Sequence, residues 1–344
     1  MAQTTGVVVA SASMAALVAQ PAWRDGLLAA LARWTGYNAP GGLWRMAAIL
    51  LALGNLKNLP FVWHIRIFRA MFYHIYVQPT PIPPHALFQP MISSTRTTLI
   101  ETDYNLHKSN STYFSDMDVS RTHLFTALMR NAIRKQSRRS GTKKSQVAGA
   151  MGATEGTSGR HIIALGGISC LFKREIPPYQ KFEMWTRLLC WDRKWFYLVT
   201  HLVKPGVAQP ESWTLQPWRK SKNRSENVDP EKLKGAIYAT ALAKYVIKRG
   251  RITVPPEQAL VDSEMVPLKP EGWEYHSPAP EQNEQSETSL PKVVQPDEWN
   301  WDVIEAERLR GLEIASKFAA MDGLHDFFDG GKEGVLGEYA DLIF

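Results

Sequence analysis

The chain has 344 residues, of which 44% are hydrophobic and 21% charged, so it can bury a sizeable core and is neither wholly disordered nor collagen-like. Its formal net charge of +7 conceals an uneven distribution: residues 1–263 carry 34 Lys/Arg against 15 Asp/Glu, and residues 264–344 carry 6 against 18. Such asymmetry indicates an interaction function in one part of the chain. Two cysteines, Cys170 and Cys190, exclude a disulfide-rich scaffold and a four-cysteine zinc site, and their apolar surroundings predict buried free thiols.

The first 90 residues are predicted to form a helical extension. Residues 6–19 are apolar, but no Lys or Arg precedes them, so a secretory signal is not indicated. Residues 46–63 are the more apolar candidate for a membrane segment, yet Lys57 and Pro60 interrupt them and disfavour a spanning helix. Residues 63–73 mix aromatic and arginine side chains at helical spacing, which suits a helix in a membrane interface and equally a helix packed on the body with its arginines in solvent. We therefore expect a cytoplasmic protein, with membrane association through this region left open.

The middle of the chain predicts one long helix and several strands. Five prolines in residues 79–90 predict an extended linker, because proline fixes φ and cannot donate a hydrogen bond. Residues 97–101 are strand-like, residues 103–110 form a polar turn, and apolar residues three to four apart predict a helix from Ser111 to near Lys135. After a loop rich in small residues (137–160), the period changes to two, and β-branched and aromatic residues predict further strands. These strands are residues 162–176, 182–191, 195–203 and 237–247.

The C-terminal part is acidic and contains one further helix. Residues 264–298 are rich in Pro, Glu, Gln and Ser and are predicted to be mostly disordered, and residues 301–320 predict an amphipathic helix. One long helix against an antiparallel sheet is an α+β architecture. We expect three parts: an N-terminal extension with the Pro-rich linker (1–90), a catalytic domain (91–257) and an acidic tail (258–344).

The polar turn holds the residues best suited to chemistry. Asp103, Asn105, His107 and Asn110 lie between a predicted strand and the start of the long helix. A helix N-terminus presents free N–H groups and the positive end of the helix dipole, which stabilise an oxyanion. A carboxylate there can activate water or attack a carbonyl directly, and an imidazole and an amide can orient the water or hold the carbonyl. On spacing alone a purely structural role stays open, in which Asp103 and Asn105 cap the turn and Asn110 or Ser111 caps the helix.

The pattern Asp-x-Asn-x-His, with Asn three and Tyr six residues after the His, resembles the signature of hotdog-fold acyl thioesterases of the 4-hydroxybenzoyl-CoA thioesterase-like group. The matching residues are Asp103, Asn105, His107, Asn110 and Tyr113. Blocks at residues 164–170, 172–176 and 191–195 are similar to fungal and animal relatives, and the fungal AM-toxin-type thioesterases resemble the chain most, over about residues 59–257. That family often has two consecutive asparagines after the histidine, whereas Ser109 replaces the first of them here.

The resemblance implies a hotdog fold, in which a curved antiparallel sheet wraps one helix, and a homodimer with its active site at the interface. It implies hydrolysis of an acyl thioester of coenzyme A or an acyl-carrier protein, with Asp103 as base or nucleophile. Asn105 and His107 would polarise the carbonyl or position water, and Asn110 and Tyr113 would contact the substrate. The same relatives suggest a role in fungal peptide-toxin or lipopeptide biosynthesis. A catalytically silent acyl-binding or membrane-peripheral protein of the same fold and a hotdog dehydratase are the alternatives.

A basic run follows the predicted helix. Residues 130–144 contain seven Lys/Arg and no acid, among them Arg138 and Arg139. The run predicts either a docking patch for the phosphates of coenzyme A or an acidic carrier protein, or a solvated helix end. It lacks interleaved aromatic residues and any recognised nucleic-acid motif, so no nucleic-acid partner is expected. The spacing of histidines and acids fits no standard metal site, and we expect neither a metal nor another cofactor.

Overall fold

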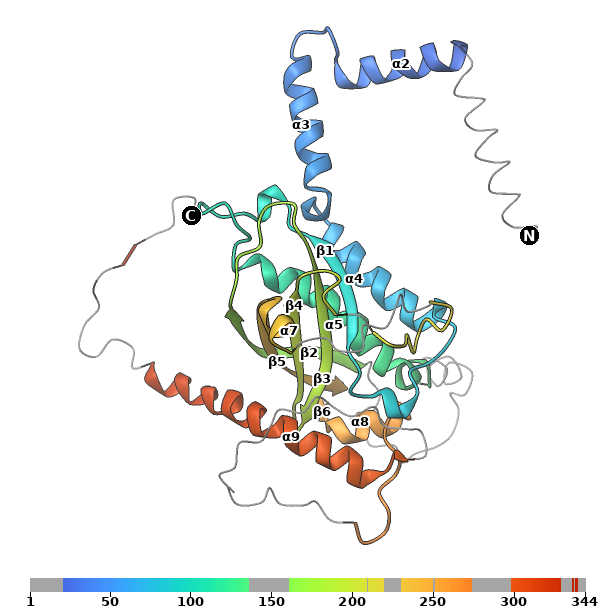
Figure 1. The fold of residues 1–344 in the computed structure, drawn as a ribbon, viewed down its shortest axis with the longest axis vertical. Coiled ribbons are helices and arrows are strands. Elements are labelled where there is room, and N and C mark those ends of the chain that lie inside the picture. Colours follow the sequence, from blue (N-terminus) through green and yellow to red (C-terminus); the bar gives the residue numbers. More distant parts are fainter. Residues whose placement is uncertain are drawn as a thin grey trace, which may run out of the picture. The chain divides into compact units, whose positions relative to one another are not determined.

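The computed structural model divides the chain into two compact units (Figure 1). One unit comprises Met1–Trp63 with Thr98–Ile100, and the other comprises His64–Thr97 with Glu101–Phe344. The residues that the structure describes are 21–135, 161–208, 210–219, 230–249, 251–273, 298–328, 336 and 338–339. The loop predicted at residues 137–160 and most of the segment predicted to be disordered therefore lie outside the described residues.

The first unit contains the helices α2 (Pro21–Thr35) and α3 (Gly42–Gly54), followed by the short helix η1 (Leu56–Asn58). The turn between α2 and α3 needs glycine, because a Cβ at Gly42 would lie 1.9 Å from the carbonyl oxygen of Gly36. No helix among the described residues is long and apolar enough to cross a membrane.

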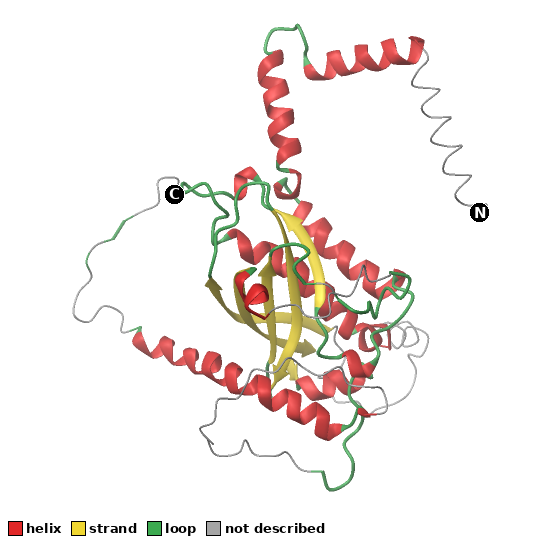
Figure 2. Cartoon of the chain, in the orientation of Figure 1, coloured by secondary structure: helices red, strands yellow, loops and turns green. Residues whose placement is uncertain are grey.

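An antiparallel sheet forms the centre of the second unit (Figure 2). Its six described strands run in the order β1-β3-β4-β5-β2, and β6 pairs with β5. The strands are β1 (Met91–Arg96), β2 (His161–Phe172), β3 (Lys181–Trp191), β4 (Phe196–Val203), β5 (Ile237–Arg249) and β6 (Ile252–Val254). The four strands predicted from the period of two are confirmed as β2, β3, β4 and β5, and β3 alternates buried and half-buried side chains over most of its length.

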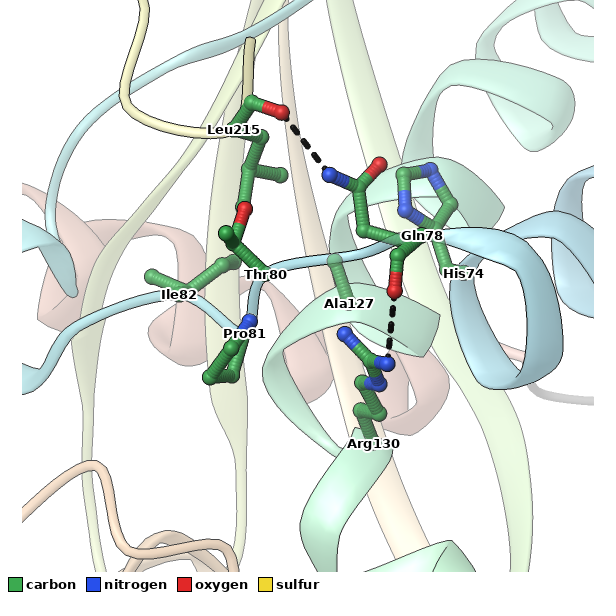
Figure 3. A pocket seen from close by; sticks show the side chains of 8 residues that line it. All are labelled: His74, Gln78, Thr80, Pro81, Ile82, Ala127, Arg130 and Leu215. Carbon is green, nitrogen blue, oxygen red and sulfur yellow. Dashed lines mark hydrogen bonds between the residues drawn. The ribbon is translucent and has the colours of Figure 1, made fainter. Parts of the chain in front are cut away.

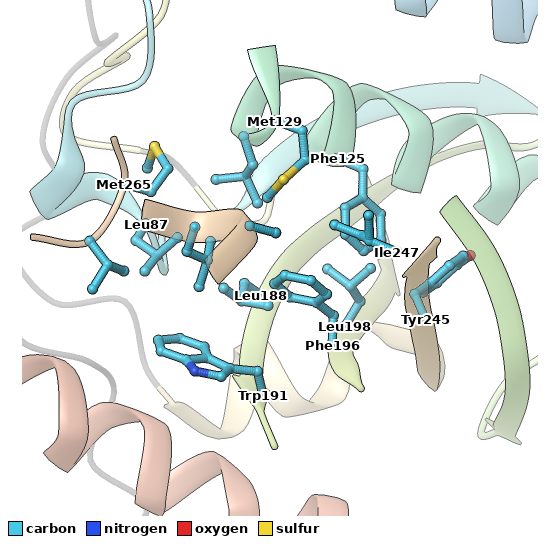
Figure 4. Close-up of a cluster of buried hydrophobic side chains, with 14 of the residues drawn as sticks. Leu87, Phe125, Met129, Leu188, Trp191, Phe196, Leu198, Tyr245, Ile247 and Met265 are labelled. Carbon is cyan, nitrogen blue, oxygen red and sulfur yellow. The ribbon is translucent and has the colours of Figure 1, made fainter. Parts of the chain in front are cut away.

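The helix α5 (Thr112–Leu128) packs against one face of the sheet, which confirms the expected α+β architecture. Phe125 of α5 packs edge-on against Phe196, at 5.8 Å between ring centroids, and against Tyr245, at 5.0 Å (Figure 4). Leu188 and Leu198 of the sheet belong to the same buried cluster. Burial of each large apolar side chain contributes roughly 1.5–3 kcal/mol. This core holds α5 against the sheet and thereby positions its N-terminus, where the polar turn lies.

The helix α9 (Trp301–Ala319), predicted at residues 301–320, covers the other face of the sheet. A register shift between Leu188 and Cys190 turns Cys190 away from the α5 core, and Cys190 packs with Phe318 of α9. Gly311 brings α9 onto the backbone of β3, since a Cβ there would lie 2.4 Å from the carbonyl oxygen of Leu189. The acidic C-terminal region therefore contributes a structural layer to the second unit.

The remaining described helices surround this framework. They are α4 (Val62–Phe72), the π-helix η2 (Tyr73–Val77), η3 (Pro84–Ala86), η4 (Leu99–Glu101), α7 (Pro230–Gly235), α8 (Pro256–Asp262) and η6 (Ala320–Phe327). α8 and β6 extend the fold beyond the last strand that the sequence predicts. Within β2, a bulge occurs between Leu165 and Gly167, and a Cβ at Gly166 would lie 2.1 Å from the Trp195 ring. Glycine at position 166 therefore allows both the bulge and the close approach of the Trp195 ring.

Two predicted segments differ from the structure. Residues 97–101 are not a strand, because they end in η4, while the preceding residues form β1, which pairs with β3. The sequence of β1 is too polar to show a period of two, and pairing with β3 stabilises it instead. The Pro-rich segment contributes Leu87 and Phe88 to the core, and Phe88 stacks on Trp191 at 6.0 Å between ring centroids. The boundaries at residues 90 and 257 stay predictions.

Candidate active site

The predicted catalytic turn is a closed loop between Thr102 and Lys108, which pair as an isolated antiparallel bridge. The N–H of Asp103 donates to the carbonyl of His107 (3.0 Å), and the N–H of Leu106 donates to the carbonyl of Asp103 (3.0 Å). Leu106 has a φ of +60°, a left-handed conformation that is unfavourable for leucine and is held here by these bonds. The loop therefore brings the side chains of Asp103 and His107 together.

His107 lies between two carboxylates. Its Nδ1 is 3.7 Å from Oδ2 of Asp103, and its Nε2 is 3.7 Å from Oε1 of Glu175. The side chains of Asp103 and His107 are 25% and 22% exposed, whereas that of Glu175 is 76% exposed. The other oxygen of Asp103, Oδ1, accepts a hydrogen bond from the N–H of Asn105 (2.9 Å). One oxygen of Asp103 is thus oriented by the backbone, and the other faces an imidazole near the surface, as general base catalysis requires.

A buried ionic network lies next to this loop. The ammonium of Lys108, which is fully buried, is 3.1 Å from Oε2 of Glu101 and 3.0 Å from Oδ2 of Asp116. Arg66 of α4 contacts the second oxygen of Asp116, Oδ1, at 3.0 Å. Two cations and two carboxylates therefore neutralise one another, which makes their burial tolerable. Since Lys108 directly follows His107, the network fixes the end of the catalytic loop to α5 and α4.

Tyr113 lies on the first turn of α5 and is 2% exposed. Its ring is 5.4 Å from the ammonium of Lys108 and packs edge-on against Phe172, at 5.0 Å between centroids. Burial raises the pKa of Tyr113, and the neighbouring Cys170 and, more weakly, Asp103 raise it further, so its hydroxyl stays protonated. Burial also raises the pKa of Cys170 to about 11, which leaves this thiol neutral and unsuited to nucleophilic attack.

The structure separates the other predicted site residues. Asn105 and Asn110 are exposed, and Asn105 orients Asp103 through its backbone N–H. Ser111 occupies the N-cap position of α5 but its side chain makes no capping bond, whereas the hydroxyl of Thr112 donates to the carbonyl of Ser109 (2.7 Å). Asp103 therefore caps the turn by accepting the N–H of Asn105, which is the structural role that the sequence left open. Its other oxygen faces His107. Arg138 and Arg139 lie outside the described residues.

Two residues at the site were missed by the sequence reasoning. Lys108 looks like a solvated lysine in a polar turn, and nothing in its local sequence predicts complete burial. Glu175 lies in the block 172–176, whose similarity to thioesterases was the available signal, although its contact with His107 depends on the fold. Glu175 reaches the loop from the segment after β2, and the burial of Lys108 depends on its contact with Asp116 of α5, so only the folded sheet and helix define these two roles.

A second polar cluster lies farther along α5. Nε2 of His74 is 2.9 Å from Nδ1 of His123, and burial lowers the pKa of each imidazole to about 4. Arg130 donates to the carbonyl of Gln78 (2.7 Å), and the side chain of Gln78 donates to the carbonyl of Leu215 (2.8 Å) (Figure 3). Arg130 is thus buried and is not part of an exposed basic patch. The small hollow beside this cluster is lined by His74, Gln78, Thr80, Pro81, Ile82, Ala127, Arg130 and Leu215, none of them a predicted site residue.

The acidic residues early in α5 have ionic partners. Asp118 pairs with Arg121 at 3.0 Å, since a spacing of three residues places the two side chains on the same face of α5. Asp116 belongs to the network with Lys108 and Arg66. In the part of the chain that the structure describes, no group of three or more His, Cys, Asp or Glu side chains could hold a metal ion.

Comparison with known proteins identifies the family. The probable thioesterase atnL of Emericella nidulans is 34% identical over 304 residues, which cover 86% of this chain and 92% of that protein. The chain belongs to the thioesterase-like superfamily. The profile of that superfamily matches residues 98–229, which include the whole loop and α5. The thioesterase poxG of Penicillium oxalicum is 34% identical over 307 residues, with the same coverage, and the thioesterase lcsJ of Purpureocillium lilacinum is 30% identical over 337 residues, covering 88% and 96%.

This thioesterase is a thioester hydrolase with a hotdog fold, in which the antiparallel sheet wraps α5. The family, fold class and enzyme class predicted from the sequence are therefore confirmed. Among solved structures, the probable thioesterase YbaW of Escherichia coli aligns with a TM-score of 0.30 and 11% identity, covering 51% of this chain and 96% of that chain. The gentisyl-coenzyme A thioesterase BH1999 aligns with a TM-score of 0.29 and 15% identity, covering 50% and 99%.

Proposed function

We propose that this thioesterase hydrolyses an acyl thioester of coenzyme A or of an acyl-carrier protein, with Asp103 as the catalytic carboxylate. The observation that carries the proposal is the geometry of this side chain. The N–H of Asn105 donates to one oxygen of Asp103, and the other oxygen lies 3.7 Å from the imidazole of His107. Both residues belong to the loop that precedes α5. A carboxylate held in this way is oriented but still near the surface, where a substrate can reach it.

In the proposed reaction, Asp103 takes a proton from a water molecule that attacks the thioester carbonyl carbon, or attacks that carbon itself. The carbon–sulfur bond then breaks, and the thiol leaves with a proton while the acyl group becomes a carboxylic acid. His107, held between Asp103 and Glu175, positions the water or the carbonyl. The free N–H groups at the start of α5 stabilise the oxyanion, because they lie at the positive end of the helix dipole.

Asn110 and Tyr113 are proposed to contact the substrate, one from the exposed rim and one from the protein interior. Tyr113 would act through a neutral hydroxyl, since its raised pKa rules out a phenolate at neutral pH. Arg138 and Arg139 are proposed to bind the phosphates of coenzyme A or an acidic carrier protein.

A homodimer with the site at its interface is part of the proposal. β2 is a terminal strand of the described sheet, and its side chains Leu165 and Leu171 are 46% and 72% exposed. Phe172, at the end of β2, also contacts Tyr113. Pairing of two copies along β2 would cover these apolar groups and bring the second copy next to the candidate site.

The pathway is proposed from the relatives. The thioesterases atnL, poxG and lcsJ are fungal proteins, which supports a role in fungal secondary metabolism, in the biosynthesis of a peptide toxin or lipopeptide. The alternative, a catalytically silent acyl-binding protein of the same fold, is less favoured because Asp103 retains an oxygen beside His107.

The decisive experiment assays a panel of acyl-CoAs and acyl-carrier proteins with the wild type and Asp103→Asn. Asparagine keeps an oxygen that can accept the N–H of Asn105, so the loop should keep its conformation while the base is lost. We expect kcat to fall at least about 100-fold with unchanged thermal unfolding. Asp302→Asn on α9 is the matched control and should hydrolyse at the wild-type rate. Equal rates for Asp103→Asn and wild type would leave Asp103 with only its turn-capping role.

A further inference from the structure

The N-terminal helices expose large apolar side chains. In the first unit, Trp23, Trp34, Leu43, Trp44 and Leu50 are between 64% and 82% exposed. The exposed residues of α3 lie all around the helix, a pattern found where a helix is surrounded by apolar material. Soluble monomers rarely expose contiguous apolar surface on this scale, and such surface marks a binding site for a protein or a membrane.

A second apolar surface lies on α4 and η2 in the second unit. Ile65, Phe68, Phe72 and Tyr76 are 61%, 62%, 59% and 61% exposed. Their spacing of three to four residues places them on one face of the helical segment. The rings of Phe72 and Tyr76 lie 5.3 Å apart, which shows that the surface is continuous from α4 into η2.

The opposite face of α4 and η2 is fixed against α5. Arg66 contacts Asp116 at 3.0 Å, and His74 lies 2.9 Å from His123. Ala70, one turn from both Arg66 and His74, is 1% exposed. These polar contacts set the rotation of the helix, so the stripe containing Phe68 and Phe72 is directed outward.

The charge of this region is almost entirely of one sign, since Asp25 is the only acid in the sequence of residues 21–77 and lies beside Arg24. From residue 26 to residue 100 the sequence contains six Lys/Arg and no Asp or Glu. Arg45 and Arg69 are exposed and neighbour the exposed Trp44 and Phe68. Arginine beside tryptophan, tyrosine and phenylalanine is the combination that binds the interface of an anionic bilayer, with the rings among the headgroups and the cations near phosphate.

We propose that residues 21–77 dock this thioesterase on an anionic phospholipid surface. A second copy of the chain is the poorer occupant, because residues 21–77 carry six Lys/Arg against one acid, Asp25, and two such cationic surfaces would repel each other. α2 and α3 have 15 and 13 residues, or about 20 Å each, and the hydrocarbon core is about 30 Å thick, so docking places them within one interface. This inference stands apart from the catalytic proposal, since none of its residues belongs to the 103–107 loop.

The test is co-sedimentation of the full chain with vesicles of phosphatidylcholine containing about 30 mol% phosphatidylserine. Phe68→Ser/Phe72→Ser and Trp44→Ser/Leu50→Ser should each bind at least about tenfold more weakly than the wild type. Each double variant loses two apolar side chains that docking would bury in the bilayer interface. Arg69→Gln should bind about fivefold more weakly to these vesicles and unchanged to pure phosphatidylcholine. The control is Phe327→Ser/Phe328→Ser, which changes two rings that follow α9 and are more exposed than Phe68 and Phe72, and it should bind like the wild type.

Hydrolysis of a water-soluble short-chain acyl-CoA, measured on the same preparations, keeps the two proposals distinguishable. Vesicle binding without hydrolysis would overturn the catalytic proposal alone. Absence of wild-type binding would overturn the docking proposal, as would equal binding by the wild type and both N-terminal double variants. If Phe68→Ser/Phe72→Ser converted a dimer to a monomer without changing vesicle binding, the surface on α4 and η2 would be assigned to a second copy of the chain instead.

Discussion

The 103–107 loop and the ionic network of Glu101, Lys108, Asp116 and Arg66 are joined at Lys108, the residue after His107, but differ in physical character. Asp103 and His107 are partly exposed and 3.7 Å apart, a distance at which solvent screens much of their attraction. In the network, the side chains of Lys108 and Asp116 are fully buried and 3.0 Å apart. The reactive groups are therefore held loosely, while the groups that position them are held tightly.

This difference separates chemistry from stability. A change in the loop alters groups that water already solvates, so it should affect catalysis with little effect on folding. A change in the network leaves a buried charge without its partner, which costs several kcal/mol. The contrast predicts that variants of the loop will lose activity and keep their stability, whereas variants of the network will lose stability.

The largest expected effect on stability is that of Lys108→Met. Methionine preserves most of the side-chain volume but leaves Glu101 and Asp116 buried without the ammonium between them. We expect the free energy of unfolding to fall by about 3–5 kcal/mol, measured by urea denaturation. Activity should fall as well, since the residue after His107 loses its anchor.

Lys173→Met is the matched control, because Lys173 is exposed at the end of the β2 segment and its ammonium contacts only the carbonyl of Lys234 among the interactions described. Its unfolding free energy should stay within about 0.5 kcal/mol of the wild type. If Lys108→Met and Lys173→Met were equally stable, the ionic network would not be the anchor of the loop.

The same contrast explains what the sequence could predict about the site. Asp103, Asn105 and His107 follow one another closely, so their type and spacing, together with the resemblance to hotdog thioesterases, predict a catalytic turn. Lys108 and Glu175 acquire their roles through partners that are distant in sequence or position. The neutrality of the network depends on Arg66, about 40 residues before the loop, and no local pattern connects the two.

The fold shows the same division. β2 to β5 are predictable because each is rich in β-branched and aromatic residues, and α5 and α9 because of their helical periods. β1 is not predictable in this way, because pairing with β3 rather than its own sequence makes it a strand. The prolines around Leu87 and Phe88 predict a linker, although the apolar side chains of these two residues fill the core.

The next expected effect concerns the pH dependence of stability at the His74–His123 contact, which extends the buried contact of α4 and η2 with α5. The pKa of each imidazole is lowered from 6.5 to about 4, chiefly by burial. Between these values the unfolded chain binds protons that the folded chain excludes, so stability is complete above pH 6.5 and falls as the pH drops toward 4.

His74→Gln should flatten this decline by on the order of 2–3 kcal/mol between pH 6.5 and 4, measured by urea denaturation at each pH. His201, whose pKa burial also lowers to about 4, keeps part of the decline in every variant. Asp103→Asn serves as the control from the loop and should leave the slope over this range steeper than that of His74→Gln. An identical pH profile for His74→Gln and wild type would show that the imidazole of His74 is not held neutral.

The smallest expected effect sharpens the comparison within the loop. Glu175 is 76% exposed and lies 3.7 Å from Nε2 of His107, so its attraction for the imidazole is weak. Glu175→Gln should lower kcat about threefold to tenfold through poorer orientation of His107, with no change in the free energy of unfolding. Glu264→Gln, which removes an exposed carboxylate paired with Lys135, is the control and should keep the wild-type kcat. A loss as large as that of Asp103→Asn would mean that Glu175 takes part in the proton transfer directly, and the site would then contain two catalytic carboxylates, one from the loop and one from the segment after β2, on either side of His107.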